Sequence, residues 1–279
     1  ISKRISKIFP KYKMLAIDDF RMRFGDGTLE TEMKVRKMFA EEILANEDAI
    51  IEYSGGANIT NLFIDQIEQN SFIVLEVTEN LETCLERVEK KDFSQIPYPK
   101  FEETIEHTIR RLDQEFKKGL IQTVFKDKYL KKFFVNSHDD MSKLPLLQYE
   151  SALKVRSLFN DGHNCLVAFG SLGRCDMNNE SDIDLFLLTK QSVAGVLKVL
   201  RPLFNRKAEW IVQKNFIAGF YRNQLVEIKV VKRAEEMTLF YVKSEISDRK
   251  KTILLGNADF ENHLFKTVDL FKDDFVEEF

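Results

Sequence analysis

Two aspartates stand two residues apart in the segment SDIDLFLLT, at positions 182 and 184. Because side chains alternate across a strand, Asp182 and Asp184 are expected on one face, and Ile183 and Leu185 on the other. Two carboxylates at that spacing repel each other unless a cation lies between them. Oxygen ligands select Mg²⁺ or Mn²⁺, so the pattern predicts a divalent metal site. The alternative is a pair of incidental acids on a solvated edge strand.

A glycine and a serine precede these acids, at the end of another apolar strand, CLVAF. Gly170 allows a phosphate to approach the backbone closely, and the amides after it open a short helix whose positive end faces an anion. Ser171 belongs to the same turn. An anion cradle beside two metal-binding acids is a layout for phosphoryl or nucleotidyl transfer with two metal ions.

The whole stretch FGSLGRCDMNNESDIDLFLL resembles the signature of the nucleotidyltransferase superfamily, which has the polymerase-β-like fold. The GSLGR…SDIDL form is similar to the uridylyl- and adenylyltransferases of nitrogen signalling and to minimal nucleotidyltransferases. The resemblance covers residues 145–235 and implies an α+β domain with a mixed sheet and helices on one side. It also implies a third carboxylate, and Glu227 in NQLVEIKVV stands where relatives usually carry Asp. The alternative is that Glu227 pairs with Lys229 on a solvated face.

The activity implied by this resemblance is transfer of a nucleoside monophosphate from a nucleoside triphosphate to an acceptor hydroxyl, with release of pyrophosphate. Two Mg²⁺ or Mn²⁺ ions would take part, and positioning and charge neutralisation would do most of the work. The catalytic acids and metal ligands would be Asp182, Asp184 and Glu227. The residues that bind the nucleotide would be Gly170, Ser171, Arg174 and Ser181. The acceptor stays open between an RNA end, a protein hydroxyl and a small molecule.

The first half of the chain alternates apolar strands with helices, which favours a parallel sheet covered on both faces. The order of its pieces resembles a small P-loop kinase. Asp18, Asp19 and Arg21 would end the strand KMLAIDDFR, and Glu52 would come at the close of the strand DAIIEYSGG, before Gly55 and Gly56. Asp19, Arg21 and Glu52 then form a kinase-like site, in which the acids would hold Mg²⁺ or a substrate hydroxyl. The alternative is that they are solvated loop residues.

The kinase resemblance lacks its phosphate loop, because no GxxxxGK[ST] occurs in the sequence. Without that backbone nest and lysine, the phosphates of a nucleotide lose their main cradle. The opening ISKRISKIF has helical spacing and is similar to the helix that comes directly after such a loop in the family. We therefore expect a truncated kinase-like domain whose loop lies upstream of Ile1.

The composition of the chain and of its segments indicates the domain boundary and the class of protein. The polar segment 134–145 predicts a junction between a kinase-like domain, residues 1–138, and a nucleotidyltransferase domain, residues 139–279. The net charge of −3 disfavours a constitutive nucleic-acid binder. Three scattered cysteines and four dispersed histidines predict a cytoplasmic protein without a zinc site. We expect no signal peptide, and no apolar run in the sequence approaches the roughly 20 residues of a membrane span. Two helices are predicted over residues 235–255 and 261–271.

These patterns leave three hypotheses about function. The first is an active nucleotidyltransferase fused to a kinase-like domain. The second is a kinase whose phosphate loop lies upstream, with the transferase domain in a regulatory role. The third is a non-enzymatic nucleotide sensor or one component of a toxin–antitoxin pair.

Overall fold

The computed structural model describes residues 1–90, 97–98, 104–159, 163–174, 176–203, 210–233 and 253–254. The chain divides into two compact units, Ile1–Met141 and Ser142–Phe279. Each unit has its own sheets and its own buried apolar residues. In the part of the chain that the structure describes, every helix is too short or too polar to cross a lipid bilayer.

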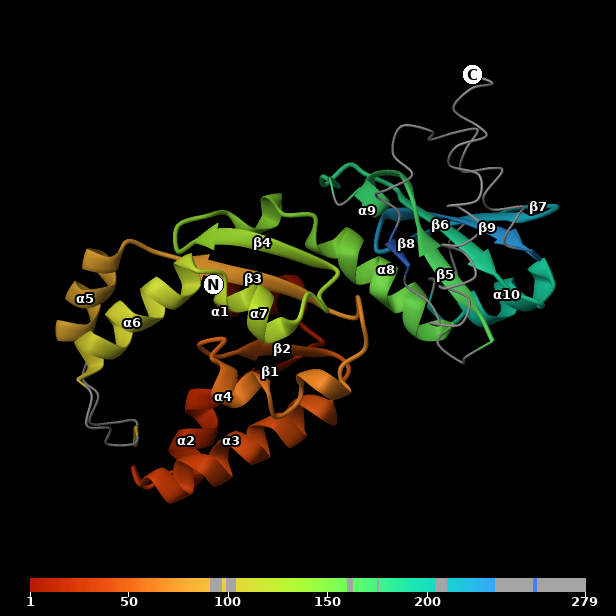
Figure 1. Cartoon of the computed structure of the whole chain (residues 1–279). Coiled ribbons are helices and arrows are strands. Elements are labelled where there is room, and N and C mark those ends of the chain that lie inside the picture. The colour runs from red at the N-terminus through yellow and green to blue at the C-terminus, as the bar shows by residue number, and fades with distance from the viewer. Residues whose placement is uncertain are drawn as a thin grey trace, which may run out of the picture. The chain divides into compact units, whose positions relative to one another are not determined.

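The first unit begins with a short helix, as its spacing predicts, and contains four strands among the residues described (Figure 1). Its elements in chain order are α1 (Ser2–Ile8), β1 (Lys13–Ala16), α2 (Ile17–Phe24), α3 (Leu29–Leu44), β2 (Ala49–Glu52), α4 (Ala57–Thr60), η1 (Ile64–Gln66), β3 (Ile73–Thr78), α5 (Leu81–Glu89), α6 (Ile105–Lys117), α7 (Leu120–Phe125) and β4 (Lys131–Asn136).

The strands of this unit form two separate parallel pairs rather than the single sheet that the sequence predicts. Strand β1 pairs with β2, from Lys13 opposite Ala49 to Ala16 opposite Glu52. Strand β3 pairs with β4, and no ladder joins the two pairs among the described residues. The parallel direction agrees with the prediction, but a continuous P-loop kinase sheet is not shown.

The prediction that Asp18, Asp19 and Arg21 lie at a strand end is wrong. Strand β1 ends at Ala16, and the next eight residues form α2. Both acids fall in the first turn of this helix, where negative side chains stabilise the helix dipole. Ile17 is buried on the inner side of the helix. The charged residues therefore belong to a helix that begins immediately after the strand.

Strand β4 occupies part of the segment predicted to be a polar junction. It is paired along its full length with β3, from Lys131 opposite Ile73 to Asn136 opposite Thr78. Its Lys132 donates a hydrogen bond to Glu76 of β3 at 2.9 Å, and both side chains are only 9% exposed. The two lysines at the start of this strand give it a polar composition, although Lys132 is neutralised by Glu76, a partner 56 residues away in the sequence.

The core beside β1 and β2 is rich in phenylalanine, as the composition predicts. Helix α3 contributes Val35, Phe39 and Ile43, which pack with Leu15 and Phe63 in one cluster. The rings of Phe39 and Tyr53 meet edge to face with centroids 6.0 Å apart. In Figure 1 helices α2 and α3 lie side by side below this pair of strands.

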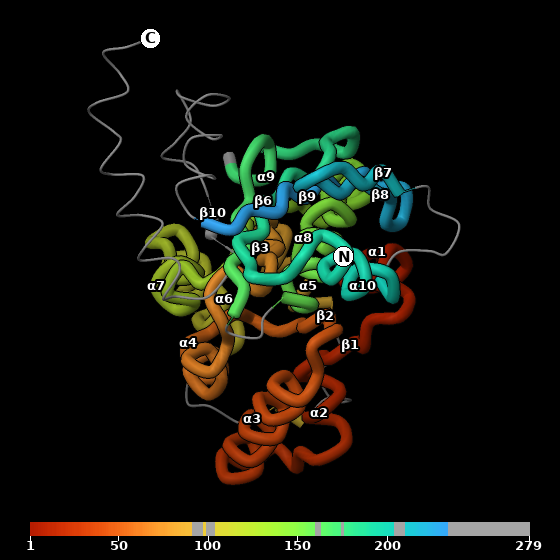
Figure 2. The backbone as a smooth tube through the Cα atoms, turned by 90° about the vertical axis from the view of Figure 1, so that its right-hand side faces the viewer, coloured from red at the N-terminus to blue at the C-terminus, as the bar shows by residue number. Residues whose placement is uncertain are grey.

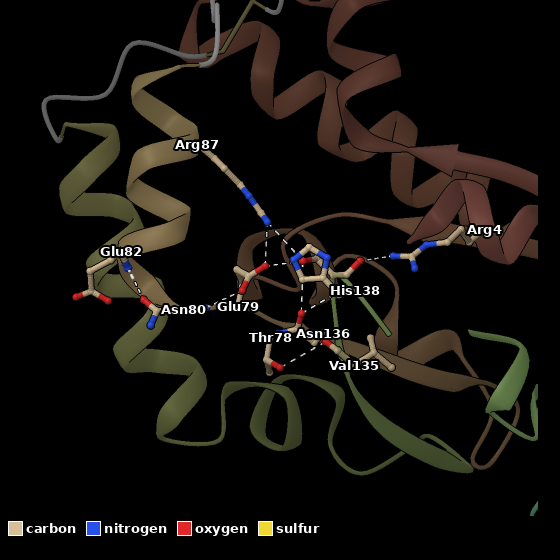
Figure 3. A network of polar contacts seen from close by, with 10 residues as sticks. Arg4, Thr78, Glu79, Asn80, Glu82, Arg87, Val135, Asn136 and His138 are labelled. Atoms are coloured by element: carbon tan, nitrogen blue, oxygen red, sulfur yellow. Dashed lines mark hydrogen bonds and ion pairs between the residues drawn. The ribbon is translucent and has the colours of Figure 1, made fainter. Parts of the chain in front are cut away.

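A polar network closes the carboxyl ends of β3 and β4 (Figure 3). Glu79 contacts Arg87 at 3.0 Å and accepts a hydrogen bond from Ser137 at 2.5 Å. Arg4 of α1 donates to the carbonyl of Asp139 at 2.7 Å and to that of Ser137. These contacts hold the pKa of Glu79 below its usual value, with the Ser137 hydrogen bond the largest cause. Since these groups bind one another, the network fastens α1, α5 and β4 together.

The second unit contains one sheet with helices on both of its sides. Its elements are η2 (Met141–Lys143), which begins at the division, then α8 (Leu146–Leu158), β5 (Cys165–Ala168), α9 (Gly170–Arg174), β6 (Ile183–Leu188), α10 (Val193–Leu200), β7 (Ile211–Gln213), β8 (Phe216–Tyr221), β9 (Gln224–Val231) and β10 (Ile253–Leu254).

The sheet is mixed, as predicted, and its strands have the order β10-β5-β6-β9-β8-β7 (Figure 2). The central pair β6–β9 is parallel, and the remaining pairs are antiparallel. Arg222 and Asn223 join β8 to β9 with positive φ angles of 48° and 65°, which is the two-residue hairpin turn that matches the twist of the strands. The turn predicted at these residues is therefore confirmed.

The two faces of this sheet differ in what covers them. Helices α8 and α10 pack on one face, against β6, β8 and β9, while α9 lies on the other side (Figure 2). The expectation of helices on one side is thus met only by α8 and α10. The helix predicted over 235–255 is wrong at Ile253 and Leu254, which pair with β5 as β10. The rest of that helix and the helix at 261–271 lie outside the described residues.

Candidate metal and nucleotide site

Three carboxylates meet on the face of the second sheet that bears α9. Asp184 of β6 lies directly opposite Glu227 of β9, and Asp182 precedes β6 by one residue. One carboxylate oxygen from each lies within 4.8 Å of the other two, and no other such group occurs among the described residues. The structure therefore brings together the three acids that the sequence singled out.

Neighbouring apolar side chains fix this arrangement. Ile183 and Leu185 flank Asp184 and are fully buried on the face that α8 and α10 cover. Val226 and Ile228 flank Glu227 and are 1% exposed. Because a slip of one residue would turn these apolar side chains toward solvent, the register is strongly specified. The carboxylates are held on the opposite face by the burial of their neighbours.

The electrostatics of the site show the expected repulsion between its acids. Burial raises the pKa of Glu227 above its usual value, and the nearby charge of Asp182 raises it further. A cation among these oxygens would favour their charged forms and lower that pKa. The oxygen donors and their mutual distances fit Mg²⁺ or Mn²⁺.

Gly170 brings the turn after β5 against the acid cluster. Its φ is +57°, a conformation that residues with a Cβ atom rarely adopt. A Cβ atom at this position would lie 2.2 Å from Oδ2 of Asp184. The amide of Phe169 donates to the carbonyl of Asp184 at 3.1 Å, which fixes the turn to β6. Only glycine leaves the Asp184 carboxylate in its place.

Ser171 places a hydroxyl oxygen inside the protein without a hydrogen-bond partner among the described residues. A buried polar atom left unpaired costs about 1–3 kcal/mol. The amide of Asp176 donates to the carbonyl of Ser171 at 3.1 Å, which closes the loop after α9. The Ser171 hydroxyl therefore keeps an unused hydrogen-bonding capacity in the turn after β5.

Ser181 has a local role in the structure. Its hydroxyl accepts a hydrogen bond from the amide of Asn178 at 3.0 Å and contacts the Asn178 side chain at 3.3 Å. The amide of Glu180 donates to the same Asn178 side chain at 2.8 Å. This turn delivers the chain to Asp182. The sequence signal for it is the asparagine-rich NNES, which is typical of such turns. Arg174 is the last residue of α9.

Among the predicted kinase-like residues, Arg21 has partners within its own unit. Arg21 is bound by Glu32, at 2.6 and 3.0 Å, and by Asp18 at 3.0 Å. Asp19 lies on α2 and Glu52 is exposed at the end of β2. Sequence reasoning missed Tyr98, whose hydroxyl donates to Asp18 at 2.8 Å while its ring lies 5.0 Å from the Arg21 guanidinium. These contacts stabilise α2 and α3.

Neither a protein-family model nor a curated protein sequence matches this chain. Among solved structures, it resembles Cid1 in complex with the UTP analogue UMPNPP, with 21% identity over 37% of this chain and 36% of that chain, at a TM-score of 0.27. A cytoplasmic RNA terminal U-transferase matches with 18% identity over 39% and 37%, at 0.28. The Cid1 poly(U) polymerase matches with 20% identity over 39% of each chain, at 0.27. The chain spans less than two fifths of the length of these proteins, so the function proposed below rests on the site itself.

Proposed function

We propose that the second unit is a metal-dependent nucleotidyltransferase, which moves a nucleoside monophosphate from a nucleoside triphosphate to an acceptor hydroxyl. The observation that carries this proposal is the acid triad, whose oxygens lie within 4.8 Å of one another beside the Gly170 turn. Three acids on one face would be mutually destabilising without a cation. Asp182, Asp184 and Glu227 would hold the Mg²⁺ or Mn²⁺ ions, which neutralise the charge of the triphosphate when bound.

Binding of the triphosphate and removal of the acceptor proton can be assigned to residues of the site. The Ser171 hydroxyl and the open backbone at Gly170 would bind oxygens of the triphosphate. The Ser171 hydroxyl, which has no partner in the described part of the chain, would donate a hydrogen bond to one of these oxygens. Glu227 would take the acceptor proton, since its carboxylate lies in the triad together with Asp182 and Asp184. The oxygen of the acceptor then bonds to the α-phosphorus as the bond to the β-phosphate breaks, and pyrophosphate leaves.

The test is transfer of label from α-³²P-labelled ATP, GTP, CTP and UTP, with Mg²⁺ or Mn²⁺ and with RNA or cell lysate as the source of acceptors. An Asp182→Ala/Asp184→Ala variant should lose all transfer. Glu180→Ala is the matched control, because it removes a carboxylate from the same segment but outside the triad. Failure of all four nucleotides with the folded wild-type protein would refute the proposal.

The two other hypotheses make different predictions for the same protein. A nucleotide sensor would bind a nucleoside triphosphate and protect the protein from unfolding without any transfer of label. For a kinase in the first unit we find no support, because Arg21 is engaged with Glu32 and the strands form two separate pairs. Label from γ-³²P-labelled nucleotides on any acceptor would revive that hypothesis.

A further inference from the structure

Beside the acid triad lies a group of apolar side chains that the proposed chemistry does not use. Phe220 of β8 is 50% exposed and Ile211 of β7 is 57% exposed. Leu225 of β9 lies directly opposite Phe220 and is half-buried. We call Ile211, Phe220 and Leu225 the apolar platform.

The strand register places this platform on the same face as the triad. Ala218 lies opposite Glu227 on one side and opposite Ile211 on the other, and residues directly opposite share a face. Phe220 comes two residues after Ala218 and therefore has the same orientation. The neighbouring Tyr221 points the other way, since its hydroxyl donates to Glu150 of α8 at 3.3 Å.

The order of the strands places the Gly170 turn and the apolar platform on opposite sides of the acid triad. The Gly170 turn comes after β5, the acids lie on or next to β6 and β9, and the platform lies on β9, β8 and β7. In Figure 2 the labelled strands β10, β6, β9 and β8 follow one another from left to right across the sheet. The acids therefore separate the turn that would receive the triphosphate from the platform. A group bound on the platform would therefore approach Glu227 from the side opposite to the Gly170 turn.

The distance between Phe220 and Glu227 indicates the size of the acceptor group. Phe220 is the diagonal neighbour of Glu227 across the antiparallel pair, and such neighbours are about 7–8 Å apart. That separation is comparable with the span of one nucleoside from its ribose hydroxyl to its base. An exposed aromatic ring stacks with any base, because every base has a π face.

We propose that the acceptor is the end of a single-stranded nucleic acid, whose terminal base stacks on Phe220 so that its ribose hydroxyl reaches Glu227. This inference rests on the proposed function and adds its substrate class. Lys229 lies two residues beyond Glu227 on the same face, and Lys214 is exposed in the turn between β7 and β8. Both lysines lie beside Phe216, across Glu227 from Phe220, where their positive charges suit a phosphate backbone that runs past Glu227 and away from the platform. Phe220 is in this account a substrate-binding residue.

The experiment measures binding and transfer separately with the full chain. Short RNA and DNA oligonucleotides, labelled at the 5′ end, carry either a normal 3′-terminal nucleotide or an abasic one. Their dissociation constants are measured by fluorescence anisotropy with Ca²⁺ and an unlabelled nucleotide, and transfer kinetics are measured with Mg²⁺. The variants are Phe220→Ala and Phe220→Tyr, which keeps the ring. The matched control is Phe134→Ala, since Phe134 is an exposed phenylalanine of the first unit.

Stacking of one base predicts that Phe220→Ala weakens binding of the normal end about 5- to 100-fold. The dissociation constant of the abasic end should not change, and Phe220→Tyr and Phe134→Ala should bind like the wild type. In transfer, the KM for the acceptor should rise while the KM for the nucleotide stays the same. Thermal unfolding of each variant checks that the half-exposed site tolerates truncation.

Other results overturn the inference. Equal losses on normal and abasic ends, or no loss at all, would show that Phe220 does not stack with a base. Transfer to a peptide hydroxyl by a wild-type protein that binds no oligonucleotide would refute a nucleic-acid acceptor and leave the proposed function standing. Binding of oligonucleotides that depends on Phe220 but is accompanied by no transfer would support the platform and refute the transferase. Comparison of the RNA and DNA arms identifies the sugar.

Discussion

Replacement of Gly170 by alanine tests the geometry of the site with one methyl group. The new Cβ would lie 2.2 Å from Asp184 Oδ2, so the carboxylate must retreat by more than about 1 Å to reach an ordinary contact. A displacement of that size in a catalytic group costs on the order of 100-fold in rate. The positive φ adds about 1–2 kcal/mol of backbone strain. We expect Gly170→Ala to fold with reduced stability and to lose roughly 99% of its transfer activity.

Two other glycines serve as controls that separate the effect of backbone strain from the effect of displacing Asp184. Gly119 also has a positive φ, +85°, but a Cβ there would come no closer than 3.4 Å to Gln122. Gly119→Ala should therefore lose about 1–2 kcal/mol of stability and keep full activity. Gly195 lies in α10 with no positive φ and no contact under 3.5 Å. Gly195→Ala should be neutral or stabilising by about 0.5–1 kcal/mol.

The assays are urea unfolding, initial rates of transfer from the active nucleotide, and Mn²⁺ affinity by titration calorimetry. Gly170→Ala should show weaker Mn²⁺ binding, because Asp184 is displaced. Turnover and Mn²⁺ affinity within about twofold of wild type would refute the reasoning, since that difference is smaller than about 0.5 kcal/mol. Loss of activity in Gly119→Ala would equally show that strain, not displacement of Asp184, is responsible.

Three further predictions concern charged groups. Because the folded-state pKa of Glu227 is raised, its ionised form destabilises the metal-free fold, so Glu227→Gln should raise the free energy of unfolding at pH 7. This gain should shrink as the pH falls through the raised pKa, while transfer should be lost, and urea titrations at several pH values check the sign. Arg21→Ala leaves the 4% exposed Glu32 with one partner fewer and should destabilise the first unit by about 1–3 kcal/mol, with transfer rates unchanged; urea unfolding measures the loss. Lys132→Ala should cost about 3–5 kcal/mol because it leaves Glu76 buried and unpaired, whereas Lys132→Met/Glu76→Leu should be nearly neutral; an equally unstable double variant would contradict this.

The acid triad could be predicted from the sequence because two local patterns determine it. Alternation of apolar and acidic residues in β6 and β9 sets the face of each carboxylate, and burial of the apolar set fixes the register. The glycine before the acids was equally informative, since its positive φ and its contact with Asp184 both require the absence of a side chain. The catalytic roles of these residues stay predictions.

Features that depend on distant partners could not be predicted in this way. Strand β4 can carry a polar sequence within a sheet because Lys132 is neutralised by Glu76 of β3. From the sequence, the charged residues of α2 are expected at the end of a strand. In the structure they lie on a helix, and Arg21 forms an ion pair with Glu32 of α3. Phe220 is exposed at the end of β8 that β7 does not pair with, which its apolar character does not reveal. Each of these features is set by a pairing that sequence spacing alone does not contain.

The parallel pairing of β6 with β9 also determines when the site can exist during folding. The hairpin of β8 and β9 is local, because only Arg222 and Asn223 separate its strands, and hairpins of this kind form in microseconds. Pairing of β9 with β6 must instead close a long loop, whose entropy is lost before any contact is gained. Glu227 therefore reaches Asp184 only when the finished hairpin docks on the centre of the sheet. A chain emerging from the ribosome would carry its aspartates early but would gain a complete acid triad only after β9 had been synthesised and docked.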